Sequence, residues 1–395
     1  MNPGPTLGQI LRSVIEANAA RSLRLSPQQW KTLGALAACQ TSALGGQVYY
    51  CGACGREHFV AHSCRNRHCP ACQGARALEW LEGQEAALLP IPYFHLVFTL
   101  PHVLNGLIRQ NRHALYNLLF AAASQTLLEF GRQRLKAQIG ITVVLHTWSQ
   151  NLLDHYHVHC IVTGGGLALE GRRWSSSPGH YLFPIRALSR MFRGKYLAGL
   201  KALFDADQLR FHGQIEPLAR PQEFFGLLRA AAQPNWVVYA KRPFAGPQQV
   251  LAYLSRYTHR VAISNARLLR ADARSVSFAY KDYADQSRRK VMTLERGEFV
   301  RRFCLHVLPE RFVKIRHYGL LGNRQRYQRL ERARQLLGAV RPEPDPASVL
   351  AIKTALVRVL AVLPRCPYCH QPALVLLREV PPERWPRRGP PLDSS

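Results

Sequence analysis

The sequence predicts an α+β protein in which an antiparallel sheet is flanked by helices and preceded by a small helical, cysteine-rich domain. Three observations support this class. Residues 93–101, 141–148 and 154–162 are short runs rich in β-branched and aromatic residues, which are typical of strands. A long apolar stretch with helical spacing separates the first run from the second. The second and third runs are joined by a short link, which favours an antiparallel pair.

The elements before the sheet are predicted from spacing and capping. Residues 1–38 are expected to be helical, because apolar residues recur at helical spacing and Ser26-Pro27 is a typical helix start. A cysteine-rich block follows at 39–72, and residues 73–89 predict another helix. Prolines at positions 90 and 92 then mark a boundary. We therefore expect a helical and zinc-binding domain at 1–89 and a second domain at 90–340.

The remaining elements are predicted in the same way. A helix is expected at 103–137, and Gly164–Gly166 are expected to form a turn after the strand at 154–162. The later expected helices are 186–204, 247–261 and 298–307, and the later expected strands are 236–240, 275–281 and 290–294. Residues 341–395 are predicted to be a linker and a Pro/Arg-rich tail with a lone C-x-x-C pair.

Composition indicates a globular protein with a polyanionic partner. The chain has 395 residues, of which 47% are hydrophobic, so full cores for two or three domains are expected. Lys and Arg outnumber Asp and Glu by 53 to 24, which gives a formal net charge of +29. Such an excess favours nucleic acid as the partner, with a membrane surface second. The sequence shows neither a membrane-length apolar run nor a signal-peptide pattern, so we expect a soluble cytoplasmic protein.

Two cysteine pairs predict a structural zinc site. Fourteen residues separate Cys51-Gly-Ala-Cys54 from Cys69-Pro-Ala-Cys72, a spacing close to that of paired zinc knuckles. Four thiolates hold Zn(II) in a tetrahedron. Cys39 and Cys64 remain, with histidines at positions 58, 62 and 68, and they could build a second site or be buried thiols beside surface histidines. Cys366-x-x-Cys369 has no second pair downstream, so it is either a remnant or takes ligands from elsewhere.

The strand at 154–162 carries three alternating histidines. Successive side chains of a strand point to opposite faces, so His155, His157 and His159 share one face. Three imidazoles make a poor core stripe, and neutral imidazole is the commonest protein metal ligand. A metal site on this face is therefore predicted, with a row of solvated histidines as the alternative.

A tyrosine pair could supply a nucleophile. Tyr253 and Tyr257 are four residues apart on the expected helix at 247–261, so they share a face. Alone, such a pair more often borders a core stripe. Beside a metal-binding strand, however, it supplies what covalent cleavage of a phosphodiester requires, because a cation can stabilise the phenolate and the developing charge. Arginines that suit DNA phosphates, or else form a solvated face, are Arg65, Arg67, Arg256 and Arg260.

Several strings resemble a known family. His157-Val-His159 is similar to the His-hydrophobic-His motif of HUH endonucleases, and Tyr253-x-x-x-Tyr257 resembles their two-tyrosine class. Over about residues 25–335, the chain resembles the rolling-circle transposases of the insertion-sequence ninety-one family. The strings that carry this resemblance are Cys64–Cys72, His157–Gly166, Tyr253–Asn265 and Arg316–Gly319.

The resemblance implies a fold, a chemistry and partners. The sheet would be that of an HUH endonuclease, and the cysteine block would be the family's zinc-binding domain with structural Zn(II). His157 and His159 would bind catalytic Mg(II) or Mn(II), with His155 preferred as third ligand over His146 and Gln150. Tyr253 and Tyr257 would nick and rejoin single-stranded DNA at the element's ends and at target DNA, through a 5′-phosphotyrosine.

Two other functions remain open at this point. A replication initiator or relaxase would use the same chemistry, and a zinc-ribbon DNA-binding regulator would have no catalytic activity. In each case we expect a cytoplasmic, nucleoid-associated bacterial protein with no membrane partner. The sequence leaves its oligomeric state open.

Overall fold

An antiparallel sheet with strand order β11-β4-β5-β3-β7 lies at the centre of the chain. In the computed structural model, the described residues are 4–17, 23–85, 87–178, 182–241, 250, 258–283, 285–339 and 365–383. The strands of the sheet are β3 (Tyr93–Thr99), β4 (Ala137–Trp148), β5 (Asp154–Ala168), β7 (Val238–Lys241) and β11 (Ile315–Gly319), and the short β6 (Trp174–Ser176) pairs with β5. The predicted α+β class is confirmed.

The β4–β5 hairpin is the antiparallel pair that the sequence predicts, but β5 is longer than expected. It continues through Gly164–Gly166 to Ala168, so the predicted glycine turn is wrong. Neighbouring strands approach these glycines closely: a Cβ atom on Gly166 would lie 2.4 Å from the carbonyl oxygen of Gln138 on β4. The glycines therefore permit close strand approach on both sides of β5, where a larger residue would separate the strands.

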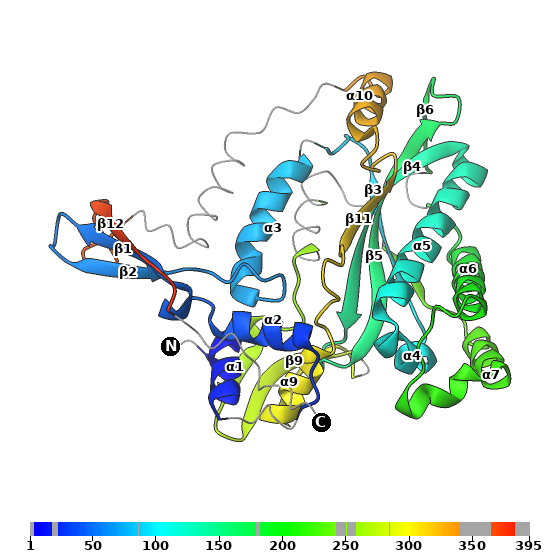
Figure 1. Cartoon of the computed structure of the whole chain (residues 1–395). Coiled ribbons are helices and arrows are strands. Elements are labelled where there is room, and N and C mark those ends of the chain that lie inside the picture. Colours follow the sequence, from blue (N-terminus) through cyan, green and yellow to red (C-terminus); the bar gives the residue numbers. More distant parts are fainter. Residues whose placement is uncertain are drawn as a thin grey trace.

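Helices cover one face of this sheet (Figure 1). They are α4 (Asn105–Gln110), α5 (Arg112–Phe130), α6 (Ile185–Asp205) and α7 (Pro221–Ala232). Tyr156, Val158 and Cys160 of β5 point into the core beneath them, as their alternation predicts. The helix expected at 103–137 is interrupted at Asn111. The amide of Asn111 donates hydrogen bonds to the carbonyl oxygens of Leu107 (3.0 Å) and Arg210 (2.9 Å), and the chain enters β4 at Ala137.

A second core joins the N-terminal helices to a later part of the chain. Helices α1 (Leu7–Glu16) and α2 (Pro27–Ala37) pack with β8 (Leu268–Ala271), β9 (Ser275–Asp282), β10 (Arg288–Glu295) and α9 (Arg296–Cys304). Leu7, Leu36 and Phe299 are among its fully buried residues. The predicted domain boundaries at residues 89 and 340 remain predictions, and this core includes residues from both sides of the first boundary.

A third group of elements lies beyond the other face of the central sheet. Helix α3 (Pro70–Glu85) lies on the side away from α5, and α10 (Arg326–Leu336) lies near one end of the sheet (Figure 1). A separate antiparallel sheet has the order β12-β1-β2, formed by β1 (Gly46–Cys51), β2 (Glu57–Ala61) and β12 (Leu374–Val380). Residues 374–380, expected in the tail, thus form a strand beside the N-terminal hairpin. The rest of the expected tail beyond residue 383 lies outside the described residues.

Short helical turns connect these elements. They are η1 (Ser42–Leu44), η2 (His102–Leu104), η3 (Gly131–Leu135), η4 (Gly213–Ala219) and η5 (Asn265–Arg267). Among the described helices, none combines the length and apolarity required to cross a membrane.

Candidate metal centres and nucleic-acid interface

Three histidines meet on the face of the central sheet that is turned away from α5. They are His146 from β4 and His157 and His159 from β5, and their ligand nitrogens all lie within 4.8 Å of one another. The antiparallel register places His146 directly opposite His157. The alternation of β5 places His159 on the same face as His157, with its ring centroid 5.0 Å away. A single cation could therefore contact three imidazoles held by two paired strands.

Hydrogen bonds orient two of the three rings. The Nδ1 atom of His157 lies 2.8 Å from the carbonyl oxygen of His155. As a donor to that oxygen it leaves Nε2 of His157 to bind an ion. The Nδ1 atom of His159 lies 2.9 Å from Nε2 of His95 on β3, and these two rings are stacked. Partners of this kind fix the tautomer and direction of metal-binding histidines.

The surroundings favour the neutral form of His157 and His159. Burial, followed by the positive charges of His155 and Arg260, lowers the pKa of His157 to about 3. Burial also lowers the pKa of His159 well below its ordinary value, with His157 and His95 adding to the effect. Neutral imidazole is the form that binds metal ions, so at neutral pH these two rings could act as metal ligands.

The geometry groups His146, and not the preferred third ligand His155, with His157 and His159. The side chain of His155 is on the predicted face, but its ring lies 5.7 Å from that of His102 and it does not belong to the three-histidine group. The reason is the register of the hairpin, since β4 presents His146 opposite His157 and becomes irregular immediately afterwards, between His146 and Trp148.

Basic side chains lie beside the histidine cluster. Arg67, Trp148, Arg260 and Lys314 help to line a small pocket, and the ring of Trp148 stacks on that of His146 at 4.7 Å. The ammonium of Lys314 donates to the carbonyl oxygen of Arg260 (2.7 Å) and lies 5.3 Å from the centre of the Trp148 ring. Positive charge next to a cation site suits a phosphate group.

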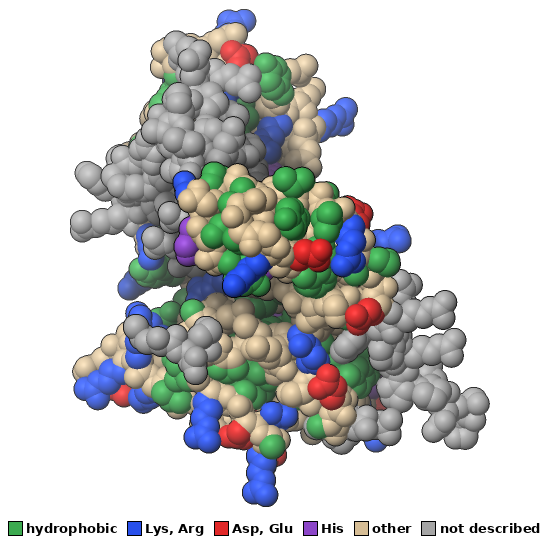
Figure 2. Space-filling view, turned by 90° about the vertical axis from the view of Figure 1, so that its left-hand side faces the viewer, with side chains coloured by type: hydrophobic (Ala, Val, Ile, Leu, Met, Phe, Trp, Pro, Cys, Tyr) green, Lys and Arg blue, Asp and Glu red, His purple; other side chains and the backbone are tan. Residues whose placement is uncertain are grey.

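The four arginines predicted to bind DNA have different surroundings. The side chains of Arg65 and Arg260 are exposed. The guanidinium of Arg67 instead donates to the carbonyl oxygens of Phe312 and Pro309, so it ties the cysteine-rich loop to the segment before β11. Arg256 lies outside the described residues. Figure 2 looks onto the side of the molecule where β1, β2 and β12 lie, and Lys and Arg side chains are spread across it.

The predicted nucleophiles Tyr253 and Tyr257 also lie outside the described residues. Described residues on either side of them are buried, namely Val250 and Thr258. Val250 belongs to the same hydrophobic cluster as Tyr93 of β3 and Ile161 of β5. Both of those side chains lie on the histidine-bearing face, because they alternate with the core residues of their strands.

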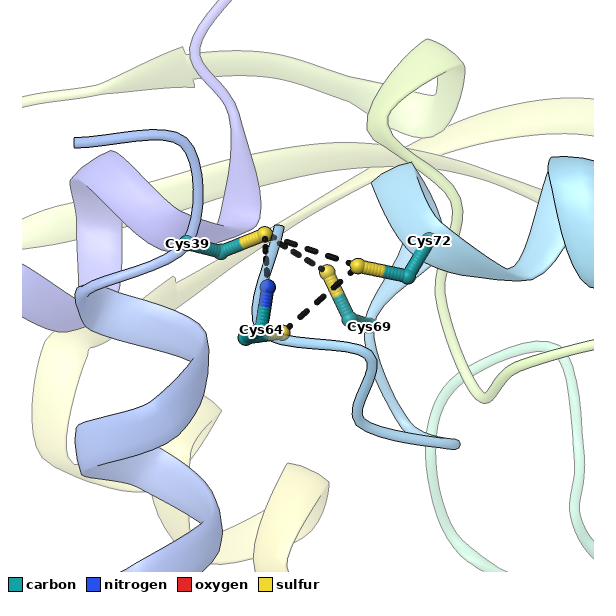
Figure 3. Close-up of side chains that lie close together, drawn as sticks. All are labelled: Cys39, Cys64, Cys69 and Cys72. Atoms are coloured by element: carbon teal, nitrogen blue, oxygen red, sulfur yellow. Dashed lines mark hydrogen bonds between the residues drawn. The ribbon is translucent and has the colours of Figure 1, made fainter. Parts of the chain in front are cut away.

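Four cysteines form a compact group at the start of α3 (Figure 3). Cys39 follows α2, Cys64 lies after β2, Cys69 immediately precedes α3 and Cys72 lies in its first turn. The Sγ atom of Cys72 is 3.6 Å from those of both Cys39 and Cys64, and Cys69 is 3.6 Å from Cys39. In a tetrahedral site with Zn–S distances of about 2.3 Å, the sulfur atoms are about 3.8 Å apart. The donor set and its spacing therefore fit Zn(II).

The predicted pairing of Cys51 and Cys54 with Cys69 and Cys72 is wrong. Cys69 and Cys72 meet Cys39 and Cys64, and Cys51 and Cys54 meet Cys366 and Cys369. The β1–β2 hairpin projects the first knuckle away from α3 (Figure 1). Spacing along the chain cannot reveal this, because six cysteines within one short block allow many pairings.

Sequence reasoning also missed residues that act on the ligands. His95 and Lys314 were not singled out, since an isolated histidine or lysine carries no signal of its own. The pairing of β3 with β5 would reveal His95. In that pairing His95 lies opposite Ile161, and His159 is its diagonal neighbour on the same face. Such a diagonal contact becomes visible only when strand order and register are known.

Comparisons with known proteins agree with these features. A family model described as "Putative transposase" matches residues 140–329, and one described as "Transposase zinc-binding domain" matches residues 10–100. The chain is 43% identical over 393 residues to "Putative transposase y4qJ" of Sinorhizobium fredii (strain NBRC 101917 / NGR234), covering 97% of this chain and 98% of the relative. It is 29% identical over 344 residues to "Transposase for insertion sequence element IS801" of Pseudomonas savastanoi pv. phaseolicola, covering 86% and 80%. No solved structure matches the chain.

The first family match contains His146, His157 and His159, and the second contains the compact group of four cysteines beside α3. The chain therefore belongs to the transposases of the insertion-sequence ninety-one family, which carry a zinc-binding domain and act on DNA.

Proposed function

We propose that this transposase nicks and rejoins single-stranded DNA at the ends of its element, through a covalent 5′-phosphotyrosine on Tyr253 and Tyr257. The observation that carries the proposal is the cluster of three imidazoles, His146, His157 and His159, whose ligand nitrogens lie within 4.8 Å of one another. Catalytic metal sites commonly use three protein ligands and keep a position for substrate, whereas structural zinc sites use four. The cluster fits the first description.

Mg(II) or Mn(II) is the proposed catalytic ion at these histidines. When bound there, it would polarise the scissile phosphate and stabilise charge that develops during the reaction. The imidazole donors of this chain favour transition metals over Mg(II). We therefore expect Mn(II) to support cleavage at a lower concentration than Mg(II) does.

The tyrosines would exchange one phosphodiester for another. The Oη atom of a tyrosine attacks the phosphorus and loses its proton, a new O–P bond forms, and the bond from phosphorus to the 3′ oxygen breaks. The 3′ oxygen takes up a proton and leaves as a hydroxyl group. Because the phosphotyrosine retains the bond energy, attack by a 3′ hydroxyl can rejoin DNA without a nucleotide cofactor. Two tyrosines permit two successive transfers.

Neighbouring residues of this chain would assist that exchange. The ordinary pKa of tyrosine is about 10, so positive charge is needed to favour the phenolate at neutral pH. Arg260 is three residues beyond Tyr257 in the sequence, and its charge reaches His157 and His159 strongly enough to lower their pKa values. Arg260 is thus suited to contact the phosphate that the histidine-bound ion would hold.

Covalent capture tests the proposal. The protein is incubated with Mn(II) and labelled single-stranded oligonucleotides of the element's ends, and adducts are separated on denaturing gels and identified by mass spectrometry. Tyr253→Phe/Tyr257→Phe should form no adduct and still bind the oligonucleotide. Tyr283→Phe is the matched control. Tyr283 follows β9 in the sequence, and its side chain is 68% exposed. An adduct that persists in the double variant would refute the proposal.

The same assay addresses the two alternatives. A replication initiator or relaxase would form the adduct with plasmid-origin or transfer-origin DNA in preference to element ends. A non-catalytic zinc-ribbon regulator would form no adduct with any DNA, and its binding would be unchanged in the double variant. Membership in a transposase family favours element ends as the substrate.

A further inference from the structure

The second four-cysteine cluster joins residues from opposite ends of the chain. Cys51 is the last residue of β1 and Cys54 follows it, and Cys366 and Cys369 precede β12. The Sγ atoms of Cys51 and Cys369 are 3.6 Å apart, and those of Cys54 and Cys366 are 3.7 Å apart. These separations are close to the sulfur spacing of about 3.8 Å in a tetrahedral zinc site, and they exceed a disulfide bond length of about 2.05 Å.

The two C-x-x-C turns have the same backbone hydrogen bonds. In the first, the N–H of Gly55 donates to the carbonyl of Cys51 (2.8 Å), and the N–H of Cys51 donates to that of Arg56 (3.0 Å). In the second, the N–H of His370 donates to the carbonyl of Cys366 (2.9 Å), and the N–H of Cys366 donates to the carbonyl of Gln371 (2.9 Å).

The residue after the second cysteine has positive φ in both turns, +70° at Gly55 and +59° at His370. Positive φ is uncommon outside glycine, so its presence at His370 shows that the second turn adopts the geometry of the first despite the different residue. The two turns are therefore a matched pair that presents four thiols to one point.

Strand pairing fixes the two turns against each other. Leu374 of β12 pairs with Cys51 of β1, and the N–H of Gly52 donates to the carbonyl of Ala373 (3.0 Å). Cys54 and Cys366 are 312 residues apart in the sequence. Neither C-x-x-C turn can hold a four-coordinate ion alone, so each pair is incomplete without the other.

This small sheet has little else to hold it together. None of the three clusters of buried hydrophobic residues found in the described part of the chain includes a residue of β1, β2 or β12. On β12, Val375, Leu376 and Leu377 are exposed. Sheets without a hydrophobic core usually require disulfides or a metal ion. Yet Cys51 and Cys366 are almost fully buried, at 0% and 1% exposure, which is unusual in a module that buries so little else.

A backbone donor and two cations lie around the cluster. The backbone N–H of Tyr368 lies 3.4 Å from the Sγ atom of Cys366. Arg56 lies over the Tyr368 ring at 5.0 Å, and Arg365 donates to the carbonyl of His370 (3.2 Å). These cations would offset the negative charge of a four-thiolate zinc centre.

We propose that Cys51, Cys54, Cys366 and Cys369 bind a second structural Zn(II), which joins the C-terminal segment to the N-terminal zinc-binding domain. Half of this ligand set lies outside both family matches, which end at residues 100 and 329. The ion is independent of the histidine cluster and of the proposed DNA chemistry. Its loss would release β12 from β1 and leave the group of Cys39, Cys64, Cys69 and Cys72 in place.

Zinc counting on the full-length protein tests this inference. The wild-type chain should contain about two zinc ions by elemental analysis, and Cys366→Ser/Cys369→Ser about one. Cys304→Ser is the control and should keep about two, because Cys304 is buried in the second core and belongs to neither cluster. One zinc per wild-type chain, or two in the double variant, would overturn the proposal.

A second measurement on the unaltered protein avoids dependence on variant folding. Native protein is treated with a thiol-alkylating reagent during stepwise chelation, and modified cysteines are identified by mass spectrometry. Cys51, Cys54, Cys366 and Cys369 should become modified together, as one zinc ion is lost. Modification of Cys366 and Cys369 while Cys51 and Cys54 stay protected and both zinc ions remain bound would show that the two turns do not share an ion.

Discussion

The cysteine group beside α3 and the histidine cluster on the central sheet are both candidate metal sites, but they differ in ligand number and setting. The first offers four sulfur atoms, three from the segment between α2 and α3 and one from the first turn of α3, packed into the second hydrophobic core. The second offers three imidazoles from two adjacent strands, beside exposed Arg260. Four ligands complete a tetrahedron, whereas three leave room for a phosphate oxygen. The difference separates a site that stabilises the fold from one suited to chemistry.

Removing a thiolate from the closed site should have the largest effect on folding. Structural zinc contributes about 10 kcal/mol or more to small zinc domains, and Cys69 and Cys72 are buried among Leu33, Leu36 and other core residues. Cys72→Ser should therefore lose zinc and most of the cooperative thermal unfolding transition, measured by calorimetry and elemental analysis. Cys160→Ser alters a buried thiol outside both clusters, and it should keep its zinc.

Removing an imidazole from the open site should abolish cleavage and leave the fold intact. His146→Ala should lower adduct formation with Mn(II) by about 100-fold or more, since changes to mere supporting residues already cost about 10- to 100-fold. His155→Ala is the matched control, because His155 is on the same strand face but outside the three-histidine group. If His155→Ala instead lost adduct formation and His146→Ala formed the adduct normally, the ligand assignment would be reversed.

The residue that supports the open site should have a smaller effect. His95 lies 2.9 Å from Nδ1 of His159, and loss of such a partner typically lowers metal affinity by about 10- to 100-fold. His95→Ala should raise the Mn(II) concentration needed for half-maximal cleavage by that factor without changing zinc content. His95→Gln retains a hydrogen-bonding side chain and should recover part of the loss. If the Mn(II) titration is the same in both variants as in the wild type, His95 does not support the site.

Lys314 lies beside Arg260 and Trp148, next to the histidine cluster, and should give the smallest effect, which depends on pH. Burial, followed by the charges of Arg67 and Arg260, lowers its pKa from the ordinary 10.5 to about 7. Between those pH values the unfolded chain binds one more proton at this residue, so the folded state gains stability as pH rises. Lys314→Met should reduce that rise, measured by urea unfolding across the window. Lys201→Met, which removes an exposed ion pair with Asp205 on α6, should leave it unchanged.

Much of the central sheet follows from local pattern. The alternation of Tyr156, Val158 and Cys160 with the histidines predicts which face of β5 is buried, because a strand has a period of two. The short link before Asp154 predicts the hairpin that was found. The long glycine-containing half of β5 could not be predicted, since it depends on how closely β4 and β6 approach it.

The sequence by itself determined the fold class, the family resemblance, the face that carries His157 and His159, and the cysteine content of the zinc-binding domain. All of these are properties of residue type and short spacing. Only the tertiary structure decided that His146 completes the histidine cluster, that Cys39 and Cys64 complete one cysteine group, and that Cys366 and Cys369 complete the other. The physical reason is that strand register and the meeting of segments 312 residues apart are set by the packing of the whole chain, which no local pattern encodes.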